Sequence, residues 1–178
     1  MDILVSYECG RFGRSKREVR EALRRCGDEQ SQIERTSVNG IAVVRTTLDG
    51  REVVRRCREL CHESFAFRFA IKWVPVDYWC ETDLEAIRKL LEAEVRGRIA
   101  EDETWGMKVE RRGWQQHHTQ DIIVYLARAI DRKVDLNHPD KLVRIDVLGN
   151  QTAISVLRPS DMFSVTASGE RHATDGDT

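Results

Sequence analysis

The sequence predicts an α+β protein made of two successive domains, and three observations carry this prediction. Apolar residues make up 40% of the 178 residues and charged residues 33%, a composition typical of a globular chain with a polar surface. Short apolar runs with a period of two alternate with segments whose apolar residues repeat at helical spacing. The pairs Asn39-Gly40 and Gly149-Asn150 are typical of tight hairpin turns. Hairpins mixed with helices favour small sheets covered by helices.

Residues 1–64 are predicted to form the first domain, in the order β-α-β-β-α. Its expected elements are a strand over 2–7, a helix over 15–26, strands over 33–38 and 41–47, and a helix over 53–61. Ser15 and Glu18 have the spacing of a capping box, in which a hydroxyl and a carboxylate satisfy free amides at a helix start. Asp49 is the expected cap of the second helix.

Residues 65–160 are predicted to form the second domain, in the order β-α-β-α-β-β. Its expected elements are a strand within 65–76, a helix over 82–95, a strand over 105–110, a helix over 122–130, and strands over 142–148 and 152–157. Thr82 and Glu85 have the spacing of a further capping box. Residues 161–178 are predicted to be a disordered tail, because Ser, Thr, Gly and Asp dominate the end of the chain.

Composition and charge exclude several classes of protein. No apolar run approaches the roughly 20 residues that a membrane helix needs. The start of the chain reads as a strand without a basic leader, so we expect no signal peptide and a cytoplasmic location. Cys57 and Cys61 lie on the apolar face of the predicted helix over 53–61, so we expect core thiols and no metal site. Because the net charge is −1, nucleic-acid binding would depend on local basic patches.

No catalytic motif is found in the sequence. The glycine patterns of dinucleotide-binding folds and P-loops, the nucleophile elbow and the zinc deaminase pair are absent. His117-His118 is the single histidine pair, and adjacent side chains diverge in either a helix or a strand. We therefore expect a protein that is not an enzyme and that holds no cofactor.

One segment carries a recognisable motif. Residues 134–150 read VDLNHPDKLVRIDVLGN: a stiff polar turn leads into a strand that alternates apolar and polar residues. This segment resembles the signature of the THUMP domain, a module of tRNA-modifying proteins, which has the form V-D-L-x-N-P-D followed by a strand, a turn and a second strand. The chain departs from it at His138, which stands between Asn137 and Pro139. RFAIKWVPVDYWC and EDETWGMKVERRG resemble the preceding strands, so the resemblance covers residues 66–158.

The resemblance implies a ferredoxin-like domain over 1–64 followed by a THUMP-like domain over 65–160. It also implies binding of tRNA through the acceptor arm and the 3′ end. The chain is similar to stand-alone members related to the adaptor that presents tRNA to an acetyltransferase making N(4)-acetylcytidine. Two alternatives stay open: a tRNA-modifying enzyme that uses carboxylates around Asp135 and Asp140, and an α/β protein-protein scaffold without RNA contact.

Basic and aromatic side chains are the candidates for RNA binding, because Lys and Arg neutralise phosphates and aromatic rings stack on unpaired bases. Trp73 and Trp105 are expected in the core, and each charged group alone is also compatible with an ordinary solvated surface. The candidates are Lys72, Lys108, Arg111, Arg112, Lys141 and Arg144 in the second half, Arg14, Lys16 and Arg17 at the start of the first helix, Asn137 in the turn, and Trp114 for base stacking.

Overall fold

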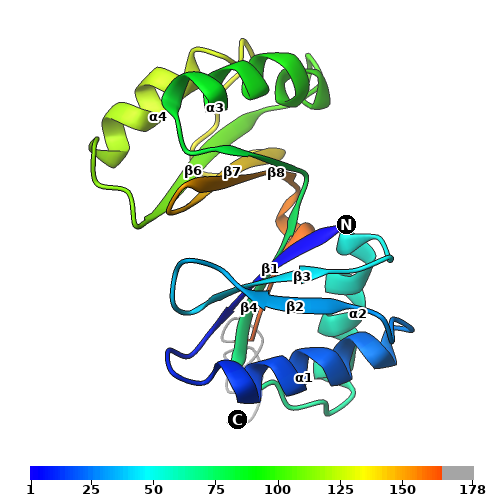
Figure 1. The fold of residues 1–178 in the computed structure, drawn as a ribbon. Helices are drawn as coiled ribbons and strands as arrows, with labels where there is room; N and C mark the ends of the chain where they lie inside the picture. The colour runs from blue at the N-terminus through cyan, green and yellow to red at the C-terminus, as the bar shows by residue number, and fades with distance from the viewer. Residues whose placement is uncertain (166–178) are drawn as a thin grey trace, which may run out of the picture. The chain divides into compact units, whose positions relative to one another are not determined.

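The computed structural model describes residues 1–165 and confirms the α+β class (Figure 1). The chain divides into two compact units. Unit 1 holds residues 1–75 and 160–165, and unit 2 holds residues 76–159. Each unit has its own sheet and its own apolar core. Among the described residues, no helix has the length and apolar character needed to cross a membrane.

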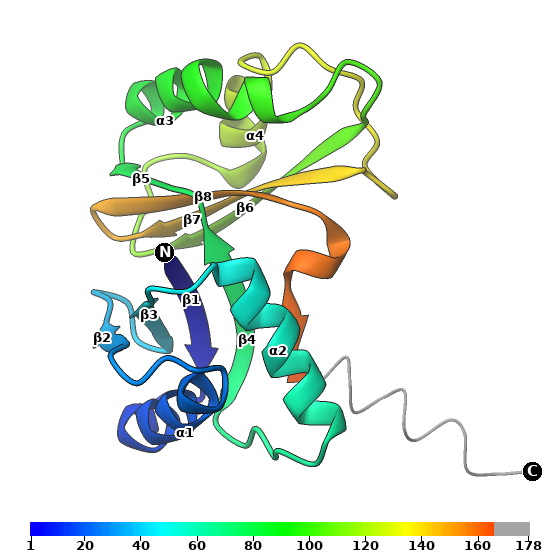
Figure 2. The ribbon, with the colours of Figure 1, turned by 90° about the vertical axis from the view of Figure 1, so that its right-hand side faces the viewer.

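Unit 1 is a five-stranded sheet with two helices. Its elements are β1 (Asp2–Tyr7), α1 (Phe12–Arg25), β2 (Gln32–Arg35), β3 (Ile41–Arg45), α2 (Gly50–His62), β4 (Ala70–Val76), η3 (Pro159–Asp161) and β9 (Phe163–Ser164). The strand order is β2-β3-β1-β4-β9. Alternate residues of β1, such as Ile3 and Val5, pack in one core with Val19 of α1 and Val53 of α2. Figure 2 shows both helices beside this sheet.

The strand Ala70–Val76 lies in the first sheet, although we predicted that it begins the second domain. It neighbours β1, and its Trp73 is buried in the core of unit 1. Unit 1 is thereby a complete β-α-β-β-α-β ferredoxin-like motif, and the chain divides after Pro75 instead of at residue 65. The prediction failed because the alternating pattern identifies a strand but does not say which sheet it joins.

The predicted tail also begins too early. Within 161–178, Phe163–Ser164 form β9, which pairs antiparallel with β4. Phe163 is buried, and its ring lies 5.6 Å from that of Phe67. Residues 166–178 lie outside the described part of the chain.

Unit 2 has the predicted order β-α-β-α-β-β, with a different first strand. Its elements are β5 (Tyr78–Glu81), α3 (Leu84–Leu90), the π-helical turn η1 (Leu91–Val95), the 3₁₀ turn η2 (Arg96–Arg98), β6 (Trp105–Arg112), α4 (Thr119–Ala127), β7 (Lys141–Leu148) and β8 (Gln151–Leu157). The strand order is β5-β8-β7-β6, and β6 runs parallel to β7. In Figure 1 and Figure 2, α3 and α4 lie over one face of this sheet. Val143, Ile145 and Val147 point to that face, where they pack in the core.

The helix starts only partly follow the predicted caps. Asp49 accepts hydrogen bonds from the amides of Arg51 and Glu52, as expected. Asp83, not Thr82, caps α3 through the amide of Ala86. The capping box at Ser15 is wrong, because α1 already begins at Phe12.

Glu18, the predicted partner of Ser15, instead accepts hydrogen bonds from the amides of Arg68, Phe69 and Ala70. These amides lead into β4, so a carboxylate on α1 fixes the start of that strand. Cys57 is a buried core thiol as predicted, and it packs with Cys26 in the core of unit 1.

Candidate nucleic-acid interface

The turn after Val134 is held against the first residue of β6. The backbone amide of Trp105 donates to the carbonyl of Lys133 at 2.9 Å, and the amide of Asp135 donates back to the carbonyl of Trp105 at 2.9 Å. The indole nitrogen of Trp105 donates to the carbonyl of Arg132 at 3.1 Å. Because the Trp105 side chain is buried in the core of unit 2, the segment that enters the turn is fixed to a rigid base.

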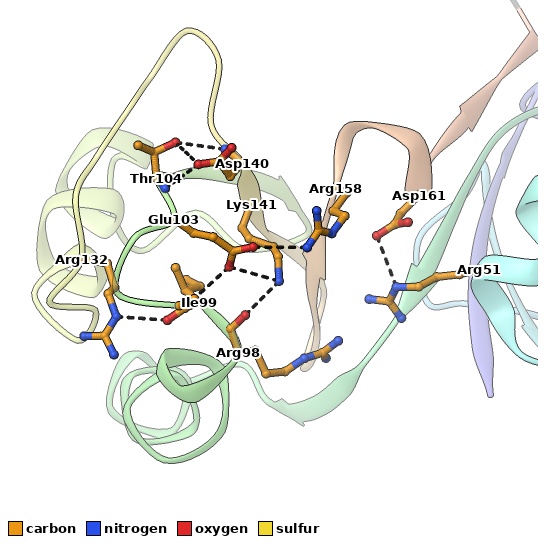
Figure 3. A network of polar contacts seen from close by, with 11 residues as sticks. Arg51, Arg98, Ile99, Glu103, Thr104, Arg132, Asp140, Lys141, Arg158 and Asp161 are labelled. Carbon is orange, nitrogen blue, oxygen red and sulfur yellow. Dashed lines mark hydrogen bonds and ion pairs between the residues drawn. The ribbon is translucent and has the colours of Figure 1, made fainter.

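Two aspartates, one at each end of the turn, fix it by accepting hydrogen bonds. Oδ1 of Asp135 accepts from the amides of Asn137 and His138, each at 2.9 Å. Oδ2 of Asp140 accepts from the amide of Thr104 at 2.8 Å and from its hydroxyl at 2.9 Å (Figure 3). These backbone amide hydrogen bonds lower the pKa of both carboxyls. Both groups are therefore anionic acceptors within the fold.

A glycine in β6 allows the turn to pack closely against this strand. A Cβ placed on Gly106 would lie 3.2 Å from the carbonyl oxygen of Asp135 and 3.4 Å from Cγ of Pro139. The turn therefore packs directly on the backbone of β6. Any larger side chain at residue 106 would have to push it outward.

The turn points its remaining side chains into solvent. Leu136 is 81% exposed and Val134 52% exposed, and Asn137 and His138 are also exposed. Lys133 is exposed next to them. Two apolar side chains, two polar ones and a cation are thus presented on a backbone that is fixed by hydrogen bonds. Sequence reasoning did not select Lys133 or Leu136, although Leu136 lies within the motif over 134–150 and Lys133 directly precedes it.

Arg144 is engaged inside unit 2. Its guanidinium makes two hydrogen bonds to Asp146, at 2.7 and 2.8 Å, and the residue is only 4% exposed. Asp146 also lies 3.8 Å from Arg112. Residues two apart on a strand share one face, so the spacing Arg-x-Asp in the sequence already carried the signal for this pair.

Arg111 fastens the loop that follows β6. It donates to the hydroxyl of Thr119 at 2.9 Å and to the carbonyl of His117. The same loop carries Trp114, which we predicted to stack on unpaired bases. Trp114 is only 9% exposed and belongs to the core of unit 2, with its ring edge-on to His117.

Lys141 is also held by internal contacts, as Figure 3 shows. Its ammonium lies 3.4 Å from the carboxylate of Glu103 and donates to the carbonyl of Arg98 at 3.0 Å, and the side chain is only 16% exposed. Glu103 also accepts from Arg158 and from the amide of Ala100. This amide, followed by Lys141, lowers the pKa of Glu103.

The other candidates are spread over both units. Lys108 is exposed on β6 and lies 3.2 Å from Glu110. Lys72 lies on β4 in unit 1 and pairs in register with Ser164. The predicted set is thus divided between the two units: Asn137 lies in the turn of unit 2, and Arg14, Lys16 and Arg17 lie on α1 of unit 1.

The first half of α1 is strongly basic. Residues 11–20 hold five basic residues and one acidic residue, Glu18. The Glu18 carboxylate accepts hydrogen bonds from the amides of residues 68–70. The only carboxylate in this helix segment is therefore engaged with the backbone and does not pair with the neighbouring arginines.

The family comparison decides what unit 2 is. Residues 81–157, which run from the last residue of β5 to the end of β8, match the model of the THUMP domain. The chain contains a THUMP domain. The turn over 134–140, called the pinned turn below, and the β7–β8 hairpin lie within the matched segment. The resemblance seen in the sequence is thereby confirmed, and the THUMP domain is completed by β5 in place of β4.

Relatives of the chain are longer than the chain itself. An uncharacterized protein, MJ0421 of Methanocaldococcus jannaschii, is 34% identical over 97 residues, which are 52% of this chain and 26% of that protein. The crystal structure of PH1313 from Pyrococcus horikoshii superposes with a TM-score of 0.60 at 16% identity, over 88% of this chain and 54% of that one. A 4-thiouridine synthetase solved with RNA and ATP superposes with a TM-score of 0.59 at 13% identity, over 88% and 41%. At such identities the structures show that the fold is shared.

Proposed function

We propose that this chain is a non-catalytic tRNA-binding adaptor, which recognises the acceptor arm and the 3′ end through its THUMP domain. The observation that carries the proposal is the pinned turn over 134–140. Its backbone is fixed by Trp105, Thr104 and Gly106, and its Leu136 and His138 side chains are presented to solvent. A 4-thiouridine synthetase that shares this fold was solved with RNA, which supports RNA as the ligand.

The adaptor acts by positioning. RNA-binding proteins that recognise unpaired ends place bases against apolar or aromatic side chains and neutralise phosphates with cations. Leu136 offers the apolar contact and Lys133 the cation. A tRNA held by its 3′ end lies at a fixed distance from a bound partner enzyme, which supplies the chemistry. Following the family resemblance, we propose a tRNA acetyltransferase that makes N(4)-acetylcytidine as that partner.

The engaged carboxylates favour an adaptor over an enzyme that works through Asp135 and Asp140. A general base needs a pKa near the working pH and a free oxygen pointing at substrate. Both carboxyls have a lowered pKa. Asp135 accepts from backbone amides within the turn, and Asp140 accepts from the amide of Thr104. They act as structural acceptors, and this role supports the adaptor over an enzyme that works through these two residues.

The test compares tRNA binding by the wild type with that by the double variant Leu136→Ala/His138→Ala. Because both side chains are exposed, the unfolding midpoint should stay unchanged while tRNA affinity falls at least about fivefold. Val124→Ala is the matched control, since Val124 is an exposed apolar residue elsewhere on unit 2. Unchanged affinity in the double variant would refute the assignment of the turn. A wild type that does not bind tRNA at low salt would instead favour the protein scaffold.

A second assay addresses the partner. The chain, a tRNA and a cytidine acetyltransferase are mixed, and acetylation is measured with and without the chain. The proposal expects acetylation to depend on the chain and to fall with the turn variant. Modification of tRNA by the chain alone would show that it is an enzyme.

A further inference from the structure

Two hollows on unit 1 share Gly10 in their linings. The first has a cavity volume of about 310 Å³ and is lined by Tyr7, Gly10, Phe12, Arg35 and the loop 36–39. The second has a cavity volume of about 320 Å³ and is lined by Gly10, Arg11, Gly13, Arg14 and Arg17. We propose that together they bind one nucleoside phosphate, with the base in the first hollow and the phosphate in the second.

The first hollow has the chemistry of a base site. The Arg35 guanidinium lies over the Phe12 ring, 4.5 Å from its centroid, and the Tyr7 and Phe12 rings are 5.6 Å apart. Rings and guanidinium planes are the surfaces on which unpaired bases stack. Phe12 is only half-buried, and the Lys16 ammonium also lies over its ring, 5.8 Å from the centroid.

Polar groups in the same hollow can read the edge of a base. Within residues 1–165, neither the Tyr7 hydroxyl nor the Asn39 carboxamide has a hydrogen-bond partner. The loop 36–39, which carries Asn39, is well fixed, because the Thr36 hydroxyl lies within donating distance of the carbonyls of Val38 and Ile41 and accepts from the amide of Val38. An amide side chain on a fixed loop offers both a donor and an acceptor, which is what the edge of a nucleobase presents.

The second hollow has the chemistry of a phosphate site. Within the described chain, Arg14 and Arg17 have no carboxylate partner. Arg11 has one long contact, in which its Nε lies 3.9 Å from a carboxylate oxygen of the exposed Glu8. Four other arginines on the helices of unit 1 differ. Arg55 and Arg56 line another hollow, but both are bound to Glu52, and Arg24 and Arg25 are bound to Glu21.

The arrangement of the second hollow favours an anion as its occupant. Three guanidiniums surround two glycines at the start of a 14-residue helix, and no side chain caps the first amides of that helix. Guanidiniums bind phosphate through paired N–H groups, and free amides add to that binding. The three arginines, not the helix end alone, define the site.

The ligand can come from two sources that share this chemistry. It is either a free nucleoside monophosphate or an unpaired nucleotide of an RNA chain. The site lies in unit 1, so it goes beyond the proposed function of the THUMP turn and does not rest on it.

The experiment follows backbone amide NMR shifts of the full ¹⁵N-labelled chain. The probes are the four nucleoside 5′-monophosphates, inorganic phosphate and a single-stranded hexaribonucleotide. We expect nucleotide-dependent shifts both at residues 10–17 and at residues 36–39. Arg14→Ala/Arg17→Ala should weaken binding about tenfold or more, and Phe12→Leu, which removes only the stacking surface, at least about fivefold. Arg24→Ala/Arg25→Ala removes the same charge from the same helix and should leave binding unchanged.

The probes separate the outcomes. Shifts at both segments with monophosphates identify a free nucleotide, and shifts at both segments with the hexaribonucleotide alone identify RNA as the source. Shifts confined to residues 10–17 that inorganic phosphate reproduces would overturn the proposal, and so would the absence of any shift. Because the turn variant Leu136→Ala/His138→Ala leaves these residues intact, its failure or success with tRNA is read separately.

Discussion

The neighbours of a cation decide whether it is available to a ligand. Lys133 and Lys141 flank the same turn and look equivalent in the sequence. Lys141 is only 16% exposed and is held by Glu103 and by the carbonyl of Arg98, whereas Lys133 is exposed beside the turn. Charge patterns in a sequence locate basic residues, but the pairing of each one depends on side chains that meet only after folding, such as Glu103.

Lys133→Ala should weaken tRNA binding and lower the slope of log affinity against log salt by about 1, because one phosphate contact and its released counterion are lost. Lys141→Ala should leave that slope unchanged and lower stability instead. Filter binding across a salt series measures the slope for each variant. An equal slope for Lys133→Ala and wild type would place the phosphate contacts elsewhere.

The turn also makes stability depend on pH. The folded-state pKa of Asp135, Asp140 and Glu103 lies below the ordinary value of each group. Their contacts therefore contribute full stability above the unfolded pKa near 4, and this contribution is lost as the pH falls through the folded pKa. Urea unfolding between about pH 5 and about pH 2 should show a shallower loss in Asp140→Asn than in the wild type. Identical pH profiles would show that the Asp140–Thr104 contact is not formed.

At the scale of the elements, the apolar periodicity correctly predicted which segments form strands and helices, but it placed their ends less accurately. The stripe Val19, Ala22 and Leu23 lies on the buried face of α1 as predicted, but the helix begins three residues before Ser15. The capping pattern failed there because Glu18 finds three amides of a distant segment, at residues 68–70, and no local pattern reveals such a partner. The second hairpin was correct, because Leu148 pairs with Gln151 across Gly149-Asn150.

Gly106→Ala tests whether the turn is fixed by its packing on β6. The added methyl would lie 3.2 Å from the carbonyl oxygen of Asp135, so the turn must shift, at a cost of about 1 kcal/mol or more. We expect lower stability, faster amide exchange at residues 135–138 and weaker tRNA binding.

Gly97→Ala is the matched control, because an added methyl there meets nothing within 4 Å. It should leave stability and tRNA binding almost unchanged. If Gly106→Ala behaved like Gly97→Ala, the turn would not be fixed by its packing on β6.

On the scale of the whole molecule, unit 1 is built from two separate parts of the chain. After the THUMP domain the chain returns to unit 1, where Asp161 pairs with Arg51 and β9 pairs with β4. The sequence could not reveal this return, because a two-residue strand is too short for a periodic signal and Ser-rich composition suggested a tail. The division into an α+β pair of units was predictable, whereas the membership of β4 and β9 was not.

Phe163→Ala should therefore destabilise unit 1, although Phe163 follows the THUMP domain in the sequence. The side chain is 2% exposed and packs on Phe67, so its loss should cost about 3–5 kcal/mol. Amide hydrogen exchange should show reduced protection in β1 and β4, with β7 and β8 unaffected. Lost protection in β7 and β8 alone would contradict the assignment of β9.

The measurement that tests the central claim most directly is binding of the full chain to a tRNA and to the same tRNA without its 3′ CCA, across a salt series. We predict salt-dependent binding that weakens clearly when the CCA is removed, because the pinned turn then loses the unpaired end that it recognises. Equal binding of the two tRNAs would contradict recognition of the 3′ end, and absence of binding at low salt would contradict tRNA as the ligand.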